Sequence, residues 1–243
     1  MMPIAREGLR QIVLSTLLLA ALGGALAWWL GWPAATPFLL VWVWVLSFFR
    51  DPPRRGCHPE GALCSACDGT VTEISRLDHH ETIGGPAVRI GAFLSLFNVH
   101  VNRSPCSGRV RSIRYQPGEF LDARHPQSGR RNESNTLVID PDPPMPGPVV
   151  VRQVAGKIAR RIICHPSIND YMEIGYRFGL IKFGSRTEVI LPERPGTKVL
   201  VTLGQKVRGG LTLLAVQEEC RMTTESRSSK VDGRKEEGDV ALT

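Results

Sequence analysis

The sequence predicts a mainly β (α+β) fold, in which a β-rich, barrel-sandwich-like domain follows an N-terminal pair of apolar helices. Two observations carry this prediction. The segment from Gln11 to Phe49 contains no charged residue, whereas the segment from Cys57 to Gln217 consists of short apolar runs separated by Gly and Pro. Repeated short runs of this kind are typical of strands joined by turns. A chain of 243 residues is long enough for one sizeable domain with extensions at its ends.

The uncharged N-terminal segment predicts a membrane helical hairpin at residues 11–49. Gln11 to Trp32 is long enough to cross a bilayer as a helix, which takes about 20 residues. Pro33 ends this helix, and Ala34 to Phe49 forms a second, shorter apolar run. A hairpin of this kind either spans twice or dips into the bilayer. It is too long for the core of a signal peptide, and 39 uncharged residues in a row fit a buried hairpin of a soluble protein less well.

Basic residues flank the hairpin on both sides. The basic N-terminal segment 1–10 and the linker 50–56 contribute Arg6, Arg10, Arg50, Arg54 and Arg55. Positive charge marks the cytoplasmic side of a membrane segment, so we expect the hairpin in the cell membrane with both ends and the following domain in the cytoplasm. Two prolines, Pro52 and Pro53, give the linker an extended path.

The β-rich domain is expected at residues 57–217. Its runs predict strands at Thr70–Ile74, Ala87–Leu96, Gly108–Tyr115, Thr136–Ile139, Val149–Val154 and Lys198–Val201. The stretch Val154–Cys164 fits either a helix or a strand followed by a helix. Gly204–Ala215 is similar to the closing hairpin of a lipoyl-type barrel-sandwich, and Lys206 lacks the context of a biotin or lipoate carrier. Residues 218–243 are polar and predict a disordered tail.

The net charge and the spacing of the cysteines indicate which partners and cofactors to expect. The formal net charge of +7 favours anionic partners. No module typical of nucleic-acid binding is present, so we expect a membrane and no nucleic acid. Cys64 and Cys67 have the spacing of a metal-binding pair, but no second pair follows at a suitable distance. We therefore expect free thiols, no metal site and no disulfide framework.

The stretch Gly179–Pro192 is the most informative part of the chain. Short apolar runs on either side of Gly184-Ser185 predict two strands. Gly184 permits a tight junction, and Ser185 presents a hydroxyl beside the preceding carbonyl, which is the minimum for an N-to-O acyl shift. From these two residues alone, an ordinary turn is the preferred interpretation.

The wider sequence changes that preference. Phe183–Pro192 (FGSRTEVILP) closely resembles the processing site of the phosphatidylserine decarboxylases, specifically their short bacterial and archaeal branch. Further similar segments occur in the family's order between about residues 45 and 215. They are Phe48–Arg54, Cys67–Val71, Phe97–Pro105, Tyr115–Ala123, Asn132–Asn135 and Ile158–Ile163. Together these segments are far more specific than any one of them.

The resemblance implies a self-processing enzyme. The proenzyme would cut itself between Gly184 and Ser185 into chains 1–184 and 185–243, which stay together as a non-covalent heterodimer. Ser185 would become an N-terminal pyruvoyl group, the covalent cofactor, which forms a Schiff base with the substrate amine and acts as electron sink. The implied reaction converts phosphatidylserine to phosphatidylethanolamine in phospholipid biosynthesis. Residues 57–217 would then be the catalytic domain, and the hairpin would hold it beside a phospholipid substrate.

Two more residues gain implied roles from the resemblance. Asp68 matches an aspartate that assists self-processing. His100 matches the first histidine of a His-x-x-His pair, and Arg103 stands where longer family members carry the second, a member of an Asp-His-Ser processing triad. The base that activates Ser185 therefore stays open. His100 is the nearby residue whose ordinary pKa suits proton transfer at neutral pH.

Three alternatives remain beside this hypothesis. Another phosphoserine lipid, such as an archaetidylserine-like one, would need the same headgroup chemistry. A membrane-anchored β-domain that binds without processing would stay a single chain. A serine hydrolase fits poorly, because the Gly-x-Ser-x-Gly motif is absent.

Overall fold

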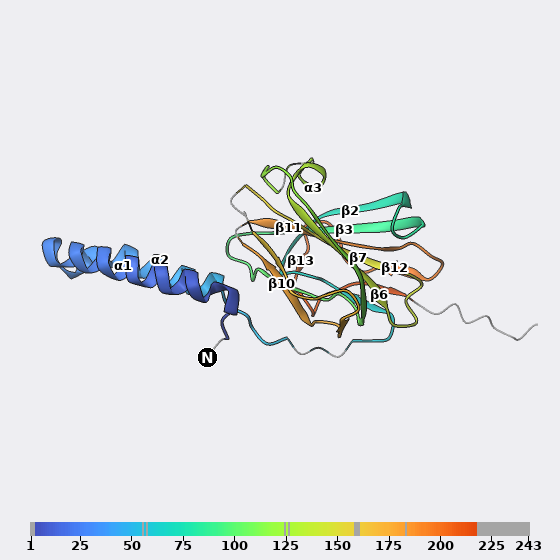
Figure 1. Ribbon diagram of the computed structural model, residues 1–243, viewed down its shortest axis with the longest axis horizontal. Helices are drawn as coiled ribbons and strands as arrows, with labels where there is room; N and C mark the ends of the chain where they lie inside the picture. The colour runs from blue at the N-terminus through green and yellow to red at the C-terminus, as the bar shows by residue number, and fades with distance from the viewer. Residues whose placement is uncertain are drawn as a thin grey trace, which may run out of the picture.

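The computed structural model describes residues 3–54, 56, 58–123, 125, 127–157, 161–182 and 184–217. A helical hairpin extends from one side of a β-rich domain (Figure 1). The mainly β prediction is confirmed, since every long element after the hairpin is a strand. The predicted tail 218–243 lies outside the described residues.

Two antiparallel helices form the hairpin. The elements are η1 (Arg6–Gly8), α1 (Leu9–Leu30), η2 (Trp32–Ala35) and α2 (Thr36–Phe48). In the part of the chain that the structure describes, Arg6–Leu30 is the one helix long and apolar enough to cross a membrane, and only 6% of its most apolar window is buried. So many exposed apolar side chains on a helix of this length indicate membrane association.

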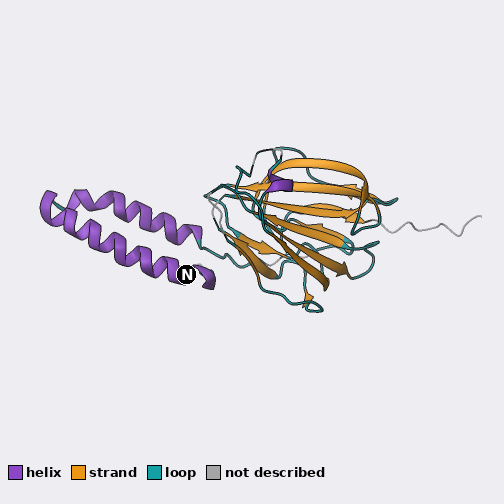
Figure 2. Cartoon of the chain, turned by 45° about the horizontal axis from the view of Figure 1, so that its top comes forward, coloured by secondary structure: helices purple, strands orange, loops and turns teal. Residues whose placement is uncertain are grey.

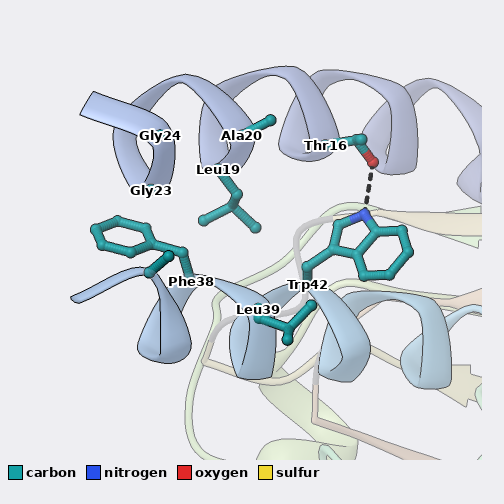
Figure 3. Close-up of a pocket in the computed structure, with 9 residues that line it drawn as sticks. Thr16, Leu19, Ala20, Gly23, Gly24, Phe38, Leu39 and Trp42 are labelled. Atoms are coloured by element: carbon teal, nitrogen blue, oxygen red, sulfur yellow. Dashed lines mark hydrogen bonds between the residues drawn. The ribbon is translucent and has the colours of Figure 1, made fainter. Parts of the chain in front are cut away.

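A small, open apolar pocket of about 220 Å³ lies between the two helices (Figure 3). Trp42 of α2 closes one end by donating a hydrogen bond from Nε1 to Oγ1 of Thr16 on α1, at 2.8 Å. Gly23 lies against the Cβ atom of Phe38, so the helices approach closely near their tip. This pocket belongs to the hairpin and does not include any of the predicted site residues.

An eight-stranded antiparallel sheet dominates the β-rich domain (Figure 2). Its strands, in spatial order, are β13 (Lys206–Val207), β2 (Gly69–His80), β3 (Gly85–Leu94), β11 (Ser185–Pro192), β7 (Val149–Val154), β6 (Ser134–Pro141), β5 (Gly108–Gln116) and β9 (Tyr171–Met172). Every residue of β11 is buried. This strand therefore lies at the centre of the fold, between β3 and β7.

Two three-stranded sheets complete the domain, with the short helix α3 (Ser128–Arg131) at its edge. One sheet consists of β1 (Ala62–Cys64), β14 (Leu213–Gln217) and β12 (Thr197–Val199). The other consists of β4 (Val101–Arg103), β10 (Arg177–Ile181) and β8 (Ile162–Cys164). The main apolar core includes side chains of the large sheet and of the β1 sheet, for example Leu63, Ile90, Leu137 and Leu214.

The six predicted strands correspond to β2, β3, β5, β6, β7 and β12, with ends that differ by a few residues. For Val154–Cys164, the structure has β7 ending at Val154 and β8 beginning at Ile162. Residues 158–160 between them lie outside the described residues.

The predicted hairpin at Gly204–Ala215 is wrong. β13 pairs with β2 in the large sheet, whereas β14 pairs with β1 and β12 in a separate sheet. The Gly209-Gly210 step, with φ of +71° at Gly210, turns the chain from one sheet to the other. A Gly-Gly step marks a sharp turn equally well within a hairpin and between two sheets, so the local pattern did not distinguish them.

Candidate active site

The chain changes sheets immediately before Ser185. β10 ends at Ile181 in a three-stranded sheet, and β11 begins at Ser185 in the centre of the large one. Gly184 makes this junction with φ of +60°, a left-handed conformation that glycine adopts without the steric cost of a Cβ atom. Ser185 is 0% exposed. The structure thus places the predicted cleavage bond between a half-buried, sharply turned Gly184 and a fully buried Ser185.

Ser185 and Thr187 face the interior between the large sheet and the β4–β10–β8 sheet. Side chains alternate along a strand, and Val189 continues the same face into the main core. Asn102 of β4 donates a hydrogen bond from Nδ2 to Thr187 Oγ1 at 3.1 Å, across the gap between the two sheets. His100 lies two residues before Asn102, just outside β4, and the alternation of side chains along an extended chain puts it on the same side. We infer that the two sheets bring His100 and Ser185 to one interior.

His100 is a buried, neutral base. Its carbonyl accepts a hydrogen bond from the Ile181 amide at 3.2 Å, which places it beside the end of β10. Its Nδ1 atom lies 2.9 Å from the Asn98 carbonyl oxygen. Because a carbonyl only accepts, Nδ1 carries the proton and Nε2 has the free lone pair.

The electrostatic environment favours this neutral form. The pKa of His100 is lowered to about 4, chiefly because burial disfavours the imidazolium; the bond to Asn98 opposes this shift, and the charge of Arg50 adds to it. The sequence-based expectation of a pKa near neutrality is therefore wrong. Burial was not visible in the local sequence, where polar residues interrupt an apolar run.

Two buried polar atoms at this site lack partners. Neither His100 Nε2 nor Ser185 Oγ has a hydrogen-bond partner among the residues that the structure describes. Unsatisfied buried polar atoms are rare in folded proteins and need an explanation. One of these atoms is an acceptor and the other is a donor, so the two groups are chemically complementary.

Gly156 makes room for the carbonyl group of Gly184. A Cβ atom at position 156 would collide with the Gly184 carbonyl oxygen and would also lie 3.4 Å from Ala123. Only glycine fits this close approach. Sequence reasoning missed Gly156, and the available signal was a glycine two residues after the end of the apolar strand β7.

A chain of buried amides extends from Thr187 into the sheet. Gln153 Nε2 donates to Asn102 Oδ1 at 2.9 Å, and Asn135 Nδ2 donates to Gln153 Oε1 at 3.1 Å. These side chains are at most 4% exposed. Sequence reasoning assigned none of them a role, although an amide inside an apolar strand, as at Gln153, is a usable signal. The chain of hydrogen bonds fixes the distance between the two sheets around Ser185.

The structure does not bring Asp68 into contact with Ser185. Its Oδ2 atom lies 2.7 Å from Arg54 NH2, and its Oδ1 atom accepts from the Gly209 amide at 2.8 Å. Asp68 precedes β2, and β3 separates β2 from β11. The carboxylate joins the linker after the hairpin to the β-rich domain.

Arg103, at the position of the second family histidine, also contacts the linker. Its NH2 atom lies 2.5 Å from Asp51 and 3.1 Å from the Pro52 carbonyl oxygen. Its NH1 atom donates to the Gly175 carbonyl at 3.1 Å. These contacts hold the guanidinium against the linker and the Gly175 carbonyl.

The thiols near the site are neutral. Cys64, Cys67, Cys106 and Cys164 are free cysteines, and burial raises the pKa of Cys67 to about 12. Within the described ranges, no group of three or more His, Cys, Asp or Glu side chains is arranged to hold a metal ion.

Comparison with known proteins identifies the family. The phosphatidylserine decarboxylase family model matches residues 43–215, which include the site. Among curated proteins named phosphatidylserine decarboxylase proenzyme, that of Rhodopirellula baltica is 40% identical over 215 residues, or 88% of this chain and 88% of its own length. That of Syntrophus aciditrophicus is 39% identical, covering 85% of this chain and 94% of its own. That of Nitrosomonas europaea is 42% identical, covering 76% and 83%. This chain therefore belongs to the phosphatidylserine decarboxylase family.

Proposed function

We propose that the chain is a proenzyme that cleaves itself between Gly184 and Ser185 and then decarboxylates phosphatidylserine to phosphatidylethanolamine. One observation carries the proposal. Ser185 has a buried hydroxyl without a partner among the described residues, directly after a sharply turned glycine, within the range that the family model matches. Relatives about 40% identical carry the name proenzyme.

Self-cleavage begins at the Ser185 hydroxyl. Its Oγ atom attacks the Gly184 carbonyl carbon, the hydroxyl proton passes to His100 Nε2, and the peptide nitrogen takes up a proton as the C–N bond breaks. The resulting ester joins Gly184 to the Ser185 side chain. Loss of the Cα proton with cleavage of the Cβ–O bond releases the Gly184 carboxylate and leaves dehydroalanine. Water then displaces ammonia and leaves a pyruvoyl group on the chain 185–243.

The surrounding residues fit this chemistry. Gly156 leaves space for the Gly184 carbonyl oxygen, and a neutral His100 is available as a base at pH 7 because its pKa is about 4. After cleavage, β11 stays paired with β3 on one side and β7 on the other. These two ladders hold the chains 1–184 and 185–243 together as a heterodimer.

In the second reaction, the pyruvoyl group supplies the carbonyl that condenses with the substrate amine and the electron sink for loss of carbon dioxide. The substrate ammonium loses its proton to solvent before condensation, because a histidine with a pKa of about 4 is too weak a base to take it. His100 Nε2 relays a proton from solvent to the carbon from which carbon dioxide departs. The buried interior excludes water from that carbon.

The hairpin places these reactions at the membrane. The substrate and product are both lipids, and the hairpin reaches the site through Phe48, whose ring centroid lies 4.2 Å from that of His100. Arginines on both flanks of the hairpin support the proposal that its ends and the domain lie on the cytoplasmic side of the cell membrane. The basic chain is attracted to anionic lipid there.

Activity in defined vesicles tests the reaction. The purified protein is mixed with phosphatidylserine vesicles, and phosphatidylethanolamine and carbon dioxide are quantified, with Ser185→Ala as control. Equal amounts of both products from the unchanged protein and none from the variant are expected. A parallel assay with a phosphoserine lipid of archaeal type determines whether the lipid tail matters. A cleaved protein that forms neither product would contradict the proposal.

A further inference from the structure

The base of the hairpin is part of the catalytic domain's packing. We define the hairpin base as residues 3–8 and 48–51. Backbone hydrogen bonds close it, from Ala5 to the Phe49 carbonyl at 2.8 Å and from Asp51 to the Pro3 carbonyl at 2.7 Å. Ala5 is 0% exposed and packs in one apolar cluster with Val99 and Leu180 of the domain. The two parts therefore meet through a packed contact.

Charged groups hold the hairpin base on the strand that leads to Ser185. Glu7 forms an ion pair with Arg177 of β10 and lies 2.6 Å from His165 Nε2. Lys182 donates from Nζ to the Glu7 carbonyl at 3.2 Å. Asp51 joins the same cluster through Arg103 at 2.5 Å. Contacts at Arg177 and Lys182 fix both ends of β10 relative to the membrane helices.

Phe48 extends this contact into the site. Among the residues of α2, all of which the structure describes, Phe48 alone is buried, with 1% of its surface exposed. Its ring centroid lies 4.2 Å from that of His100, with 32° between the ring planes. At this distance and tilt, the ring covers one face of the imidazole. The last residue of the membrane helix is therefore a wall of the interior that contains His100.

Three further groups interact with His100, and they act at other places than the face of its ring. The Asn98 carbonyl fixes the Nδ1 edge, and the amide of Ile181 bonds only to the main chain of His100. Arg50, also in the hairpin base, is the charged group that faces the imidazole. Neither backbone group shields the face of the ring from water.

We propose that Phe48 is a positioning residue: its ring fixes the plane of the His100 imidazole and keeps water from Nε2, so that the membrane hairpin completes the catalytic site. This inference rests on the proposed function, since it assigns His100 a proton-transfer role. The inference also gives the hairpin a role beyond anchoring the domain to the membrane. A hairpin that served only as an anchor would tolerate any apolar residue at its last helical position.

Titration of His100 by NMR tests the contact independently of activity. The measurement uses the full chain in lipid nanodiscs with Ser185→Ala, which keeps the polypeptide uncut. Phe48→Ala should expose the imidazole to water and move the midpoint of His100 from about 4 toward its ordinary value of 6.5. Phe48→Leu keeps most of the packing volume and should give a smaller shift of the His100 midpoint. This conservative variant controls for misfolding of Phe48→Ala. Leu40→Ala, at a 65% exposed position of the same helix, should leave the midpoint unchanged.

Self-cleavage provides the second measurement, in protein with Ser185 intact. Phe48→Ala should slow cleavage about tenfold or more, because a misplaced base loses efficiency steeply, and should shift its pH profile in parallel with the titration. An unchanged midpoint and an unchanged rate in Phe48→Ala would overturn the inference. Absence of cleavage in the unchanged protein would instead overturn the proposed function, and the titration distinguishes these two failures.

Discussion

The carbonyl oxygen of Gly184 lies against the backbone of Gly156, in a space that a Cβ atom at position 156 would fill. This carbonyl belongs to the bond that Ser185 is proposed to attack. The two glycines come from different links, one after β7 and one after β10. Their contact therefore holds the reacting carbonyl in place from a distant part of the chain.

The first prediction follows from this contact. Gly156→Ala should slow self-cleavage by about tenfold or more, because the added methyl group displaces the Gly184 carbonyl and small misplacements of reacting atoms are costly. A time course of chain cleavage on denaturing gels measures the rate. Gly85→Ala is the matched control, since nothing lies within 4 Å of a Cβ atom there. A folded Gly156→Ala protein that cleaves as fast as the unchanged chain would refute the role of this contact.

The second prediction concerns pH. In the proposed mechanism neutral His100 is the base, and its pKa is lowered to about 4. The cleavage rate should rise as pH increases through about 4 and should be level from about 5.5 upward. A histidine of ordinary pKa would instead give a rise centred near 6.5. His100→Gln should slow cleavage at every pH and abolish the rise near 4.

The third prediction concerns the buried amides. Asn102→Ala removes the bond to Thr187 and the acceptor at 2.9 Å from Gln153 Nε2, which keeps only its longer bond to the Ile163 carbonyl at 3.3 Å. Leaving buried polar groups unpaired costs about 1–3 kcal/mol of unfolding free energy. Chemical denaturation of the Ser185→Ala protein should show this loss, while exposed Gln116→Ala should show almost none. Equal stability of the two variants would mean that the amides do not join the sheets as described.

The fourth prediction separates two roles of Asp68. In the structure the Asp68 carboxylate forms an ion pair with Arg54 at 2.7 Å. The family resemblance instead implies that this carboxylate assists self-processing. If the carboxylate acts as an anchor, Asp68→Asn and Arg54→Gln should slow cleavage by similar factors, and the double variant should be no slower than either one. A large loss in Asp68→Asn alone would favour the processing role.

The sequence predicts the centre of the proposed site from a local motif and says little of the residues around it. Gly184 and Ser185 were predicted because the motif is local and contiguous. The hairpin was predicted because a long uncharged run has few structural solutions. Phe48, Gly156 and Gln153 were missed, because each acts through a contact with a residue far away in the chain. No local pattern encodes such a contact.

The same distinction explains the wrong expectations. Short apolar runs predict strands, but the partner of a strand depends on the whole fold, so β13 and β14 were joined although they lie in different sheets. The lowered pKa of His100 arises mainly from burial. This burial depends on α2 and β10, which contact His100 and lie far from it in the sequence. Both errors concern tertiary packing.

The intact mass of the purified, lipid-embedded protein under denaturing conditions tests the central claim most directly. The account predicts two chains, 1–184 and 185–243, the smaller one blocked to N-terminal sequencing and reactive toward carbonyl reagents. Ser185→Ala should instead give one chain. A single uncut chain of 26.8 kDa from folded, unchanged protein would contradict the account. So would a cleaved and active Ser185→Ala variant.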